Sequence, residues 1–311
     1  MTALGGKPIE TLTAPEARKQ PTSADAVKAL LTKQGKPTAP EPVANVANRM
    51  VPGPGGQIPV RVYTPLGAGP FPMIFYLHGG GWVIADLDTY DSSARALTNA
   101  AHAVLVSTHY RQAPEHKFPA AHEDTWAAYT WALAHAKSLN ADAAKIAVAG
   151  ESAGGNMAAV IAIRARDEKA QMPVHQLLVY PVAGSDTNTP SYQANAAAKP
   201  LNKPMMEWCF KNTVKSPAEA NDPRLALVKS QNLKGLPAAT IVAAEIDPLL
   251  SEGEALAAKL REAGVNVRYR RFDGVTHEFF GMGAAVDKAK TAVQFAAEGL
   301  KSAFAGGPPA R

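Results

Sequence analysis

Two glycines flank one serine in Gly150-Glu151-Ser152-Ala153-Gly154, the stretch whose residue types are best suited to chemistry. The apolar run 145–149 predicts a strand before the serine, and residues 153–168 predict a helix after it. A chain that turns so abruptly from strand to helix exposes the hydroxyl and has no room for side chains at the two glycines. The N-terminus of the helix would offer N–H groups and a partial positive charge to an oxyanion. The pattern predicts that Ser152 is a nucleophile.

A serine nucleophile needs a base, and the order of residues along the chain helps to choose it. In this type of site an acid and then a histidine follow the serine. Only two of the eight histidines, His175 and His277, follow Ser152. His175 precedes its predicted strand and would lie at the opposite end of the sheet, whereas His277 lies in a loop after the last one. We therefore expect His277 to be the base; the alternative is that it is an ordinary surface histidine.

The acid that orients the histidine should lie where a buried strand ends. Asp247 directly follows the continuous apolar run 239–246, which is typical of a strand buried on both faces. A carboxylate there would accept the imidazole Nδ1–H, fix the tautomer and stabilise the imidazolium. Glu245 would lie on the same strand face and is the alternative, but it is deeper in the strand. Asp273 comes too early in the histidine loop, so we expect Asp247.

A glycine-rich segment, His78-Gly79-Gly80-Gly81-Trp82, follows the second predicted strand. Three glycines let the backbone approach a substrate carbonyl closely, and a loop with free N–H groups is needed at this place. The expected oxyanion donors are the N–H groups of Gly80, Gly81 and Ala153, each worth about 3 kcal/mol of barrier. The alternatives are a flexible turn or a phosphate loop, but the segment lacks the G-K-[ST] ending and dinucleotide-type spacing. We expect His78 to support the loop.

Predicted strands and helices alternate along the chain and indicate how these residues are positioned. Strands are expected at 58–63, 72–77, 103–110, 145–149, 174–180, 239–246 and 265–272. Helices are expected at 24–33, with Ser23 as the N-cap, and at 119–138, 153–168, 203–215, 252–263 and 285–304. This alternation predicts an α/β protein with a mostly parallel, doubly wound sheet and right-handed crossovers.

The alternation stops between 181 and 238, where the sequence has little strand character. A long excursion from the carboxyl edge of a sheet is usually functional. We expect it to form a cap over the site together with the N-terminal segment; the alternative is that its apolar residues only pack onto the sheet. The expected boundaries are 1–45 for the N-terminal part of the cap, 46–185 and 236–311 for the two parts of the core, and 186–235 for the cap excursion.

Composition excludes several classes of protein. A hydrophobic content of 46% and a charged content of 19% are typical of a soluble globular chain. The net charge is +5, but the densest basic group, Arg268 with Arg270 and Arg271, lacks interleaved aromatics, so no nucleic-acid partner is expected. The single cysteine, Cys209, excludes an internal disulfide and a cysteine zinc site, and we expect it to be buried in the cap. No membrane span and no signal peptide are visible, so we expect a cytoplasmic protein unless a signal peptide has been removed.

In combination, these motifs resemble those of the hormone-sensitive-lipase-like group of α/β-hydrolases, the bacterial family IV esterases. The resemblance runs from about Tyr63 to the terminal helix and rests on the segments 78–82, 110–116, 150–156, 247–249 and His277. It implies an α/β-hydrolase fold with an eight-stranded sheet and a helical cap. It also implies that Ser152 is the nucleophile, His277 the base and Asp247 the orienting acid.

The resemblance carries further expectations about the surroundings of the site. Arg111 and Glu115 would brace the wall near the oxyanion loop, and Trp82, Met205 and Trp208 would line an acyl pocket. Members of the group are often dimers through the edge strand and the terminal helix, so a homodimer is expected by analogy. The chain departs from the group at three positions: Ser251 replaces a frequent acid, Glu278 a usual glycine and Gln112 a common leucine. A carboxylate at 278 would raise the pKa of His277.

These features predict a serine carboxylesterase that hydrolyses short acyl esters through an acyl-enzyme, with neither a metal nor an organic cofactor. The same apparatus would serve an amidase, a lactonase or a deacetylase of a specific metabolite, and the sequence leaves these alternatives open. A non-catalytic small-molecule receptor, like the plant gibberellin receptor, is the alternative of another class. That receptor has lost the catalytic histidine, whereas this chain has His277.

Overall fold

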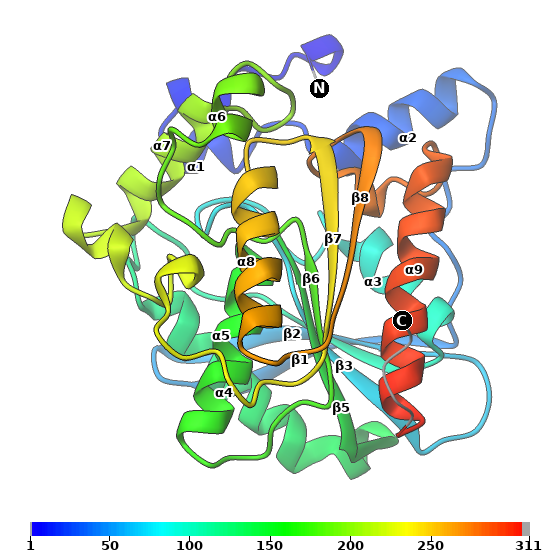
Figure 1. Ribbon diagram of the computed structural model, residues 1–311. Coiled ribbons are helices and arrows are strands. Elements are labelled where there is room, and N and C mark those ends of the chain that lie inside the picture. Colours follow the sequence, from blue (N-terminus) through cyan, green and yellow to red (C-terminus); the bar gives the residue numbers. More distant parts are fainter. Residues whose placement is uncertain (1, 307–311) are drawn as a thin grey trace.

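A single sheet organises residues 2–306, the part of the chain that the computed structural model describes (Figure 1). Its eight strands are β1 (Asn45–Gly53), β2 (Gly56–Thr64), β3 (Phe71–Leu77), β4 (Val104–Thr108), β5 (Ala141–Glu151), β6 (Gln176–Val179), β7 (Ala239–Ile246) and β8 (Val267–Thr276). Their order across the sheet is β1-β2-β4-β3-β5-β6-β7-β8. Strand β2 runs antiparallel to β1 and β4, and all other neighbours are parallel, which confirms the expected architecture.

Helices cover both faces of this sheet. One face carries α4 (Ala120–His135), α5 (Ala153–Asp167) and α8 (Leu250–Glu262), and the other carries α3 (Asp91–Ala101) and α9 (Asp287–Phe304) (Figure 1). Successive side chains of a strand point to opposite faces. Accordingly Phe75 of β3 joins the apolar cluster under α4 and α5, whereas Ile74 joins the cluster under α3 and α9. The result is three layers, with the carboxyl ends of the parallel strands at one edge.

Four elements of the structure are missing from the sequence prediction: strand β1, helix α3, and the short helices α1 (Ala14–Ala17) and α6 (Pro190–Ala194). Strand β1 pairs with β2 through a hairpin that turns between Gly53 and Gly56, and most of its side chains are not buried, so it has no apolar alternation to read. Helix α3 buries Ala94, Leu97 and Ala101. That spacing of three and four residues indicates a helix and could have been found.

Other differences concern the ends of elements. Helix α2 (Ser23–Lys33) is capped by Thr22 and not by Ser23, because the Thr22 hydroxyl accepts the N–H of Asp25 (3.2 Å) and the Asp25 carboxylate accepts the N–H of Thr22 (2.8 Å). Strand β8 ends at Thr276 and not at Phe272, because pairing with β7 resumes at Thr276 after a register shift. The other predicted strands and helices are present, with ends shifted by a few residues.

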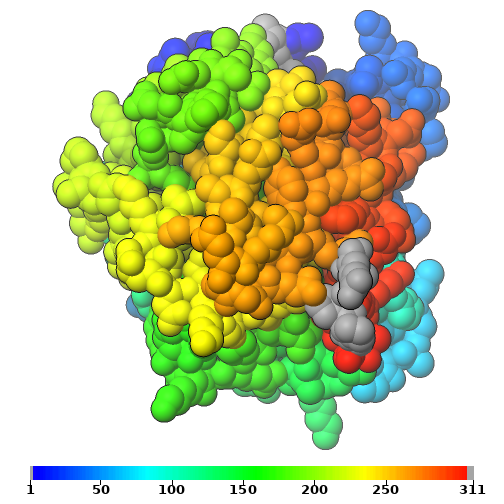
Figure 2. All heavy atoms as spheres, in the orientation of Figure 1, coloured from blue at the N-terminus to red at the C-terminus, as the bar shows by residue number. Residues whose placement is uncertain are grey.

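The N-terminal segment and the excursion after β6 meet at one end of the molecule. They contain α1 (Ala14–Ala17) and α2, and α6 (Pro190–Ala194) and α7 (Lys203–Thr213), which Figure 1 shows at the top of the view. Asn202, at the start of α7, donates to the carboxylate of Glu10 (3.1 Å). Figure 2 shows the yellow-green side chains of the excursion gathered at the upper left of the same view. In residues 2–306, no helix combines the length and apolar character that crossing a membrane requires.

The short 3-10 turns complete the chain: they are Thr2–Leu4, Ile9–Thr11, Ala136–Leu139, Pro217–Asn221, Leu227–Lys229 and Phe279–Gly281. The expected domain boundaries remain a prediction, since the contact between the two segments does not define where a cap begins or ends.

Candidate active site

Ser152 lies in the turn between β5 and α5, with φ +58° and ψ −120°. A residue other than glycine rarely adopts a positive φ, so the backbone here is strained. The glycines on either side are required by close packing: a Cβ on Gly150 would overlap the carbonyl of Gly154, and one on Gly154 would overlap the carbonyl of Leu77. The next residue, Ala153, begins α5, so its N–H belongs to the group that has no acceptor within the helix. The turn therefore combines a hydroxyl with an adjacent free donor.

Asp247 and His277 meet at the same edge of the sheet. The Asp247 carboxylate accepts a hydrogen bond from Nδ1 of His277 at 2.7 Å, and both side chains are buried. The other oxygen of Asp247 accepts the N–H of Leu249 (2.9 Å), which fixes the carboxylate. The ring of Tyr180 packs against the imidazole with 4.4 Å between ring centroids. Because β5, β6, β7 and β8 are parallel neighbours, the residues that follow them share one edge with Ser152.

The residues considered as alternatives to Asp247 and His277 have other partners in the structure. Glu245 accepts the N–H of Gly274 (2.6 Å), and Asp273 pairs with Arg271 (2.8 Å). His175 is buried against Thr240, with 2.9 Å between Nε2 and the hydroxyl. The structure therefore brings Asp247, and none of these residues, to His277.

The surroundings of His277 favour its protonated form. Burial on its own lowers the pKa of the imidazole, but the negative charges of Asp247, Glu278 and Glu151 raise it, and the net direction is upward. The Nδ1 hydrogen bond to Asp247 acts in the same sense. A base with a raised pKa holds the proton of a serine more firmly once it has taken it.

The glycine segment lies against the serine turn. A Cβ on Gly79 would lie 3.1 Å from Cβ of Ser152, which is tighter than ordinary contact. Gly80 and Gly81 have φ of +98° and +58°, values that favour glycine, and a Cβ on Gly80 would also overlap the carbonyl of Ile84. Glycine is therefore favoured at all three positions, and Gly79 is the one that packs against Ser152.

The carbonyls of the segment are held by hydrogen bonds that leave its N–H groups free. The Gly79 carbonyl accepts from Nδ1 of His78 (2.8 Å) and from the Tyr110 hydroxyl (3.0 Å). The Gly80 carbonyl accepts two backbone N–H groups of the next turn, at 3.0 and 2.9 Å. A carbonyl and the following N–H point in opposite directions across a trans peptide. The N–H groups of Gly80 and Gly81 thus point away from these partners, and within residues 2–306 they donate to no other group.

His78 supports this loop, as expected. His109 contacts His78, and Gln112 binds the backbone that follows the glycine segment. Nδ1 of His78 donates to a carbonyl, so Nε2 of the neutral ring accepts, and His109 donates to it from Nδ1 (3.1 Å). Burial, with a smaller effect of His109, lowers the pKa of His78 to about 3, which keeps the ring neutral. Gln112 donates to the carbonyls of Ile84 and Ala85 (2.8 Å each). The glutamine that departs from the family pattern therefore stabilises the end of the glycine loop.

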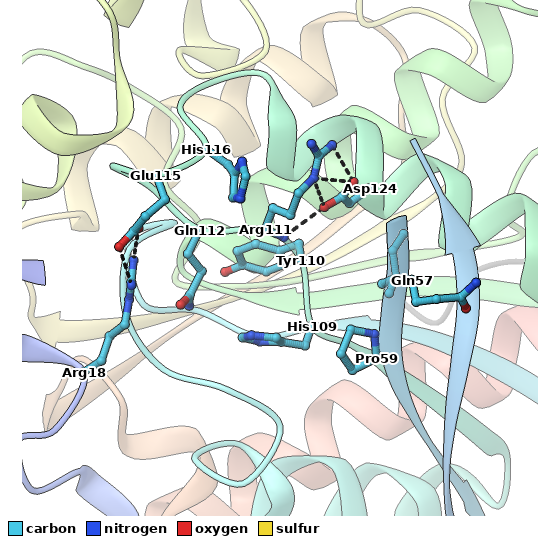
Figure 3. A pocket seen from close by; sticks show the side chains of 11 residues that line it. Arg18, Gln57, Pro59, His109, Tyr110, Arg111, Gln112, Glu115, His116 and Asp124 are labelled. Atoms are coloured by element: carbon cyan, nitrogen blue, oxygen red, sulfur yellow. Dashed lines mark hydrogen bonds and ion pairs between the residues drawn. The ribbon is translucent and has the colours of Figure 1, made fainter. Parts of the chain in front are cut away.

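Two ion pairs brace the wall behind the loop (Figure 3). Arg111 pairs with the buried Asp124 (2.7 Å), and Arg18 pairs with Glu115 (2.7 Å). Arg18 also donates to the carbonyl of Val83 (2.8 Å), which lies just after the glycine segment. The expected bracing role of Arg111 and Glu115 agrees with these contacts, and Arg18 of the N-terminal segment is the partner that the sequence did not reveal.

These ion pairs line a cavity of about 340 Å³ that Figure 3 shows from close by. Its walls include His109, Arg111 and His116, but neither Ser152 nor His277. The cavity is therefore separate from the site where we expect chemistry.

Trp82, Met205 and Trp208, which are expected to line the acyl pocket, differ from one another in their contacts. Trp82 is buried, and its ring packs near those of His122 (6.3 Å) and Phe210 (6.1 Å). Met205 is partly buried against the same cluster. Trp208 donates from Nε1 to a backbone carbonyl of the N-terminal segment (3.0 Å). Their role in an acyl pocket stays a prediction.

Cys209 is buried, as expected, and its position next to the loop was not foreseen. A Cβ on Gly81 would overlap Sγ of Cys209, so the thiol packs directly on the loop. Burial raises the pKa of the thiol to about 12, which keeps it uncharged.

A cluster of phenols and carboxylates beneath the site was missed by the sequence analysis. The carboxylate of Glu151 accepts from the hydroxyls of Tyr76 (2.5 Å) and Tyr180, and Glu278 accepts from Tyr90 (2.5 Å). Burial and the charge of Glu278 raise the pKa of Glu151 to about 7. These contacts join residues far apart in the chain, so no local pattern could have indicated them.

Comparisons with known proteins identify the family to which this fold belongs. A family model described as alpha/beta hydrolase fold matches residues 74–281. The chain is 39% identical over 249 residues to the carboxylic ester hydrolase LipN of Mycobacterium tuberculosis, a match that covers 78% of this chain and 66% of LipN. It is 32% identical over 298 residues to an ethyl acetate hydrolase of Pseudomonas putida, with 94% and 92% covered. This chain thus spans slightly less than two thirds of LipN.

A solved structure is similar over nearly the whole chain. It is a hyperthermophilic esterase from the archaeon Pyrobaculum calidifontis, with a TM-score of 0.86 and 36% sequence identity. The similarity covers 94% of both chains. In the described residues, no group of three His, Cys, Asp or Glu side chains is arranged to hold a metal ion.

Proposed function

The chain belongs to the α/β-hydrolase fold family, as a carboxylic ester hydrolase like its relatives, and we propose that it cleaves short-chain acyl esters by acyl transfer to Ser152. The observation that carries this proposal is the buried hydrogen bond between Asp247 and His277, at the same sheet edge as the strained serine. The ester bond is favoured over an amide or a lactone because the relatives are named for ester hydrolysis.

Proton transfer in this mechanism follows from the hydrogen bond to Asp247. A carboxylate can only accept, so the imidazole proton is on Nδ1 and Nε2 is the basic nitrogen. Nε2 of His277 takes the proton of Ser152 as the hydroxyl attacks the ester carbonyl. Asp247 stabilises the imidazolium that forms, without taking the proton itself.

Charge then develops on the carbonyl oxygen and is met by backbone donors. The N–H groups of Gly80, Gly81 and Ala153 hold this oxygen, which binds more tightly as it becomes an oxyanion. His277 returns its proton to the leaving alcohol, and the acyl group remains on Ser152. His277 then takes a proton from a water molecule as that water attacks the acyl carbon. The acid is released when His277 returns the proton to the Ser152 oxygen.

The direct test is the rate of a variant that lacks the nucleophile. Ser152→Ala should lower kcat/KM for p-nitrophenyl acetate and butyrate by roughly 10⁴-fold or more, because the acyl-enzyme cannot form. Ser138→Ala is the matched control, since that exposed hydroxyl only donates to the carbonyl of His135. A near-normal rate in Ser152→Ala would contradict the proposal.

Two further expectations stay predictions. We expect a homodimer through β8 and α9, because β8 is an edge strand with one unpaired side. We also expect cytoplasmic residence. Light scattering after size exclusion measures the mass of the particle, and a monomer at micromolar concentration would contradict the first expectation.

A further inference from the structure

Glu278, the residue after His277, has an unusual backbone conformation. Its φ is +70° and its ψ is 1°, in the left-handed region that favours glycine. Its side chain is also a half-buried carboxyl group, and this burial raises its pKa despite the opposing effects of His277 and Tyr90. A strained backbone and the removal of a carboxyl group from water both cost stability, so the surrounding contacts must hold them in place.

The contact that holds Glu278 comes from Tyr90. The Tyr90 hydroxyl donates to the Glu278 carboxylate at 2.5 Å, and the tyrosine is itself buried at the N-terminus of α3. A hydrogen bond from a phenol to a carboxylate is stronger than a bond between neutral groups. Tyr90 thereby fixes the residue that immediately follows the expected base.

The same hydroxyl also touches the oxyanion loop. A Cβ on Gly79 would overlap the Tyr90 hydroxyl, so the two groups are in direct contact. The rings of Tyr90 and His78 lie 5.9 Å apart, which places the phenol along the loop. Gly79 precedes the donor Gly80 and lies against Ser152. A single side chain thus contacts the histidine loop and the oxyanion loop together.

We propose that Glu278 and Tyr90 form a bridge that positions His277 relative to the oxyanion donors, so that both are positioning residues for ester hydrolysis. This inference rests on the proposed roles of Ser152 and His277. The bridge acts on geometry: it holds the base and the oxyanion donors at fixed positions relative to each other. This matters while the serine proton moves to His277 and negative charge develops on the carbonyl oxygen. A displacement of about 1 Å in such a site costs up to about 100-fold in rate.

Three variants distinguish the effect of the Tyr90–Glu278 hydrogen bond from the effect of the negative charge of Glu278. Tyr90→Phe removes the bridging hydroxyl, and Glu278→Gln keeps an oxygen that can accept from it. Glu278→Gly removes the acceptor but supplies the residue that suits the left-handed backbone. Tyr63→Phe is the matched control, because it removes a phenol–carboxylate hydrogen bond to Asp91 of α3 (2.7 Å).

The measurement is kcat and KM for p-nitrophenyl butyrate, with the melting temperature of each variant. We expect kcat to fall about 10- to 100-fold in Tyr90→Phe and Glu278→Gly, with KM within about twofold, because the loss arises after substrate is bound. Glu278→Gln should keep kcat within about threefold, since the hydrogen bond is retained. Tyr63→Phe should match the wild type. A purely structural role would lower the melting temperature without this split.

Wild-type kcat in both Tyr90→Phe and Glu278→Gly would overturn the bridge, as would an equal loss in Glu278→Gln and Glu278→Gly. A loss in Tyr63→Phe as large as that in Tyr90→Phe would also overturn it. These outcomes are distinct from failure of the proposed function. In that case the wild-type protein would neither hydrolyse the ester nor react with a fluorophosphonate, whatever the state of the bridge.

Discussion

The Asp247 carboxylate accepts the Nδ1–H of His277 across 2.7 Å, although the two residues are 30 positions apart in the chain. They directly follow the neighbouring parallel strands β7 and β8, so the sheet itself brings them together. Both are buried, and at a buried site the hydrogen bond fixes both the tautomer and the orientation of the ring. Rate and pH dependence should follow from this pair.

Asp247→Asn should lower kcat by about 10⁴-fold while the fold is retained, because an amide can donate to Nδ1 and stabilise the wrong tautomer. The measurement is kcat for p-nitrophenyl butyrate. Glu245→Gln is the matched control: it lies two residues earlier, binds the N–H of Gly274, and should keep a near-normal kcat. Equal rates in the two variants would contradict the assignment of Asp247.

The acid limb of kcat/KM should lie above the ordinary histidine value of 6.5. Only the neutral imidazole can take the serine proton, and the charges of Asp247, Glu278 and Glu151 raise the pKa of His277 against the effect of burial. Removal of one negative charge favours the neutral ring. Glu278→Gln should therefore shift the limb to lower pH, so that activity persists in more acidic buffer.

The control for this pH shift is Asp273→Asn, which removes a charge of the same sign from an exposed position of β8 four residues before His277. Solvent screens that charge, so its limb should stay near the wild-type position. A limb that does not move in Glu278→Gln, or that moves to higher pH, would contradict the account of His277.

Glu252 should make folding stability depend on pH. Its carboxyl is buried in α8, where one oxygen accepts the N–H of Ala183 (2.8 Å) and the other has no partner within residues 2–306. Burial raises its pKa from 4.5 to about 8. The folded state then binds the proton more tightly than the unfolded state, so this stabilisation is complete below pH 4.5 and is lost as pH rises through about 8.

Glu252→Gln removes this titration but keeps an acceptor for Ala183. Its melting temperature, compared with that of the wild type, should rise as pH increases from 5 to about 9. Glu254→Gln, on the exposed side of the same helix, should show no such trend. A difference between Glu252→Gln and wild type that is constant over this range would contradict a buried neutral carboxyl.

Cys209 should be unreactive in the folded protein. The thiol is buried against Gly81, and its pKa of about 12 leaves almost no thiolate at neutral pH. Ellman's reagent should detect no thiol in the native protein and one per chain after denaturation. Immediate stoichiometric reaction of the native protein would show that the packing of the excursion on the oxyanion loop is wrong.

Local patterns predicted the elements that carry chemistry. The apolar run of β7 is buried over most of its length, and Asp247 follows it directly, so one strand placed the acid. A Cβ at position 150 or 154 would overlap a backbone carbonyl, so the serine turn requires glycine at both positions. This requirement is why the turn can be recognised in the sequence. These signals are local because they arise from backbone geometry.

Contacts between distant segments could not be predicted in this way. The carboxylate of Glu151 is bound by Tyr76 and Tyr180, and Glu278 by Tyr90, which lies 188 positions away in the chain. Arg18 reaches Glu115 from an N-terminal segment in which the sequence predicts only the helix 24–33. Each of these side chains is common in proteins, and only the assembled sheet gives it a partner.

Covalent labelling by a fluorophosphonate tests the central claim most directly, because the reagent reacts with a serine that is activated by a base beside an oxyanion site. Peptide mapping by mass spectrometry should find one adduct, on Ser152, and the rate of labelling should fall at least about 100-fold in His277→Ala. An unlabelled wild-type protein, or an adduct on another residue, would contradict the account.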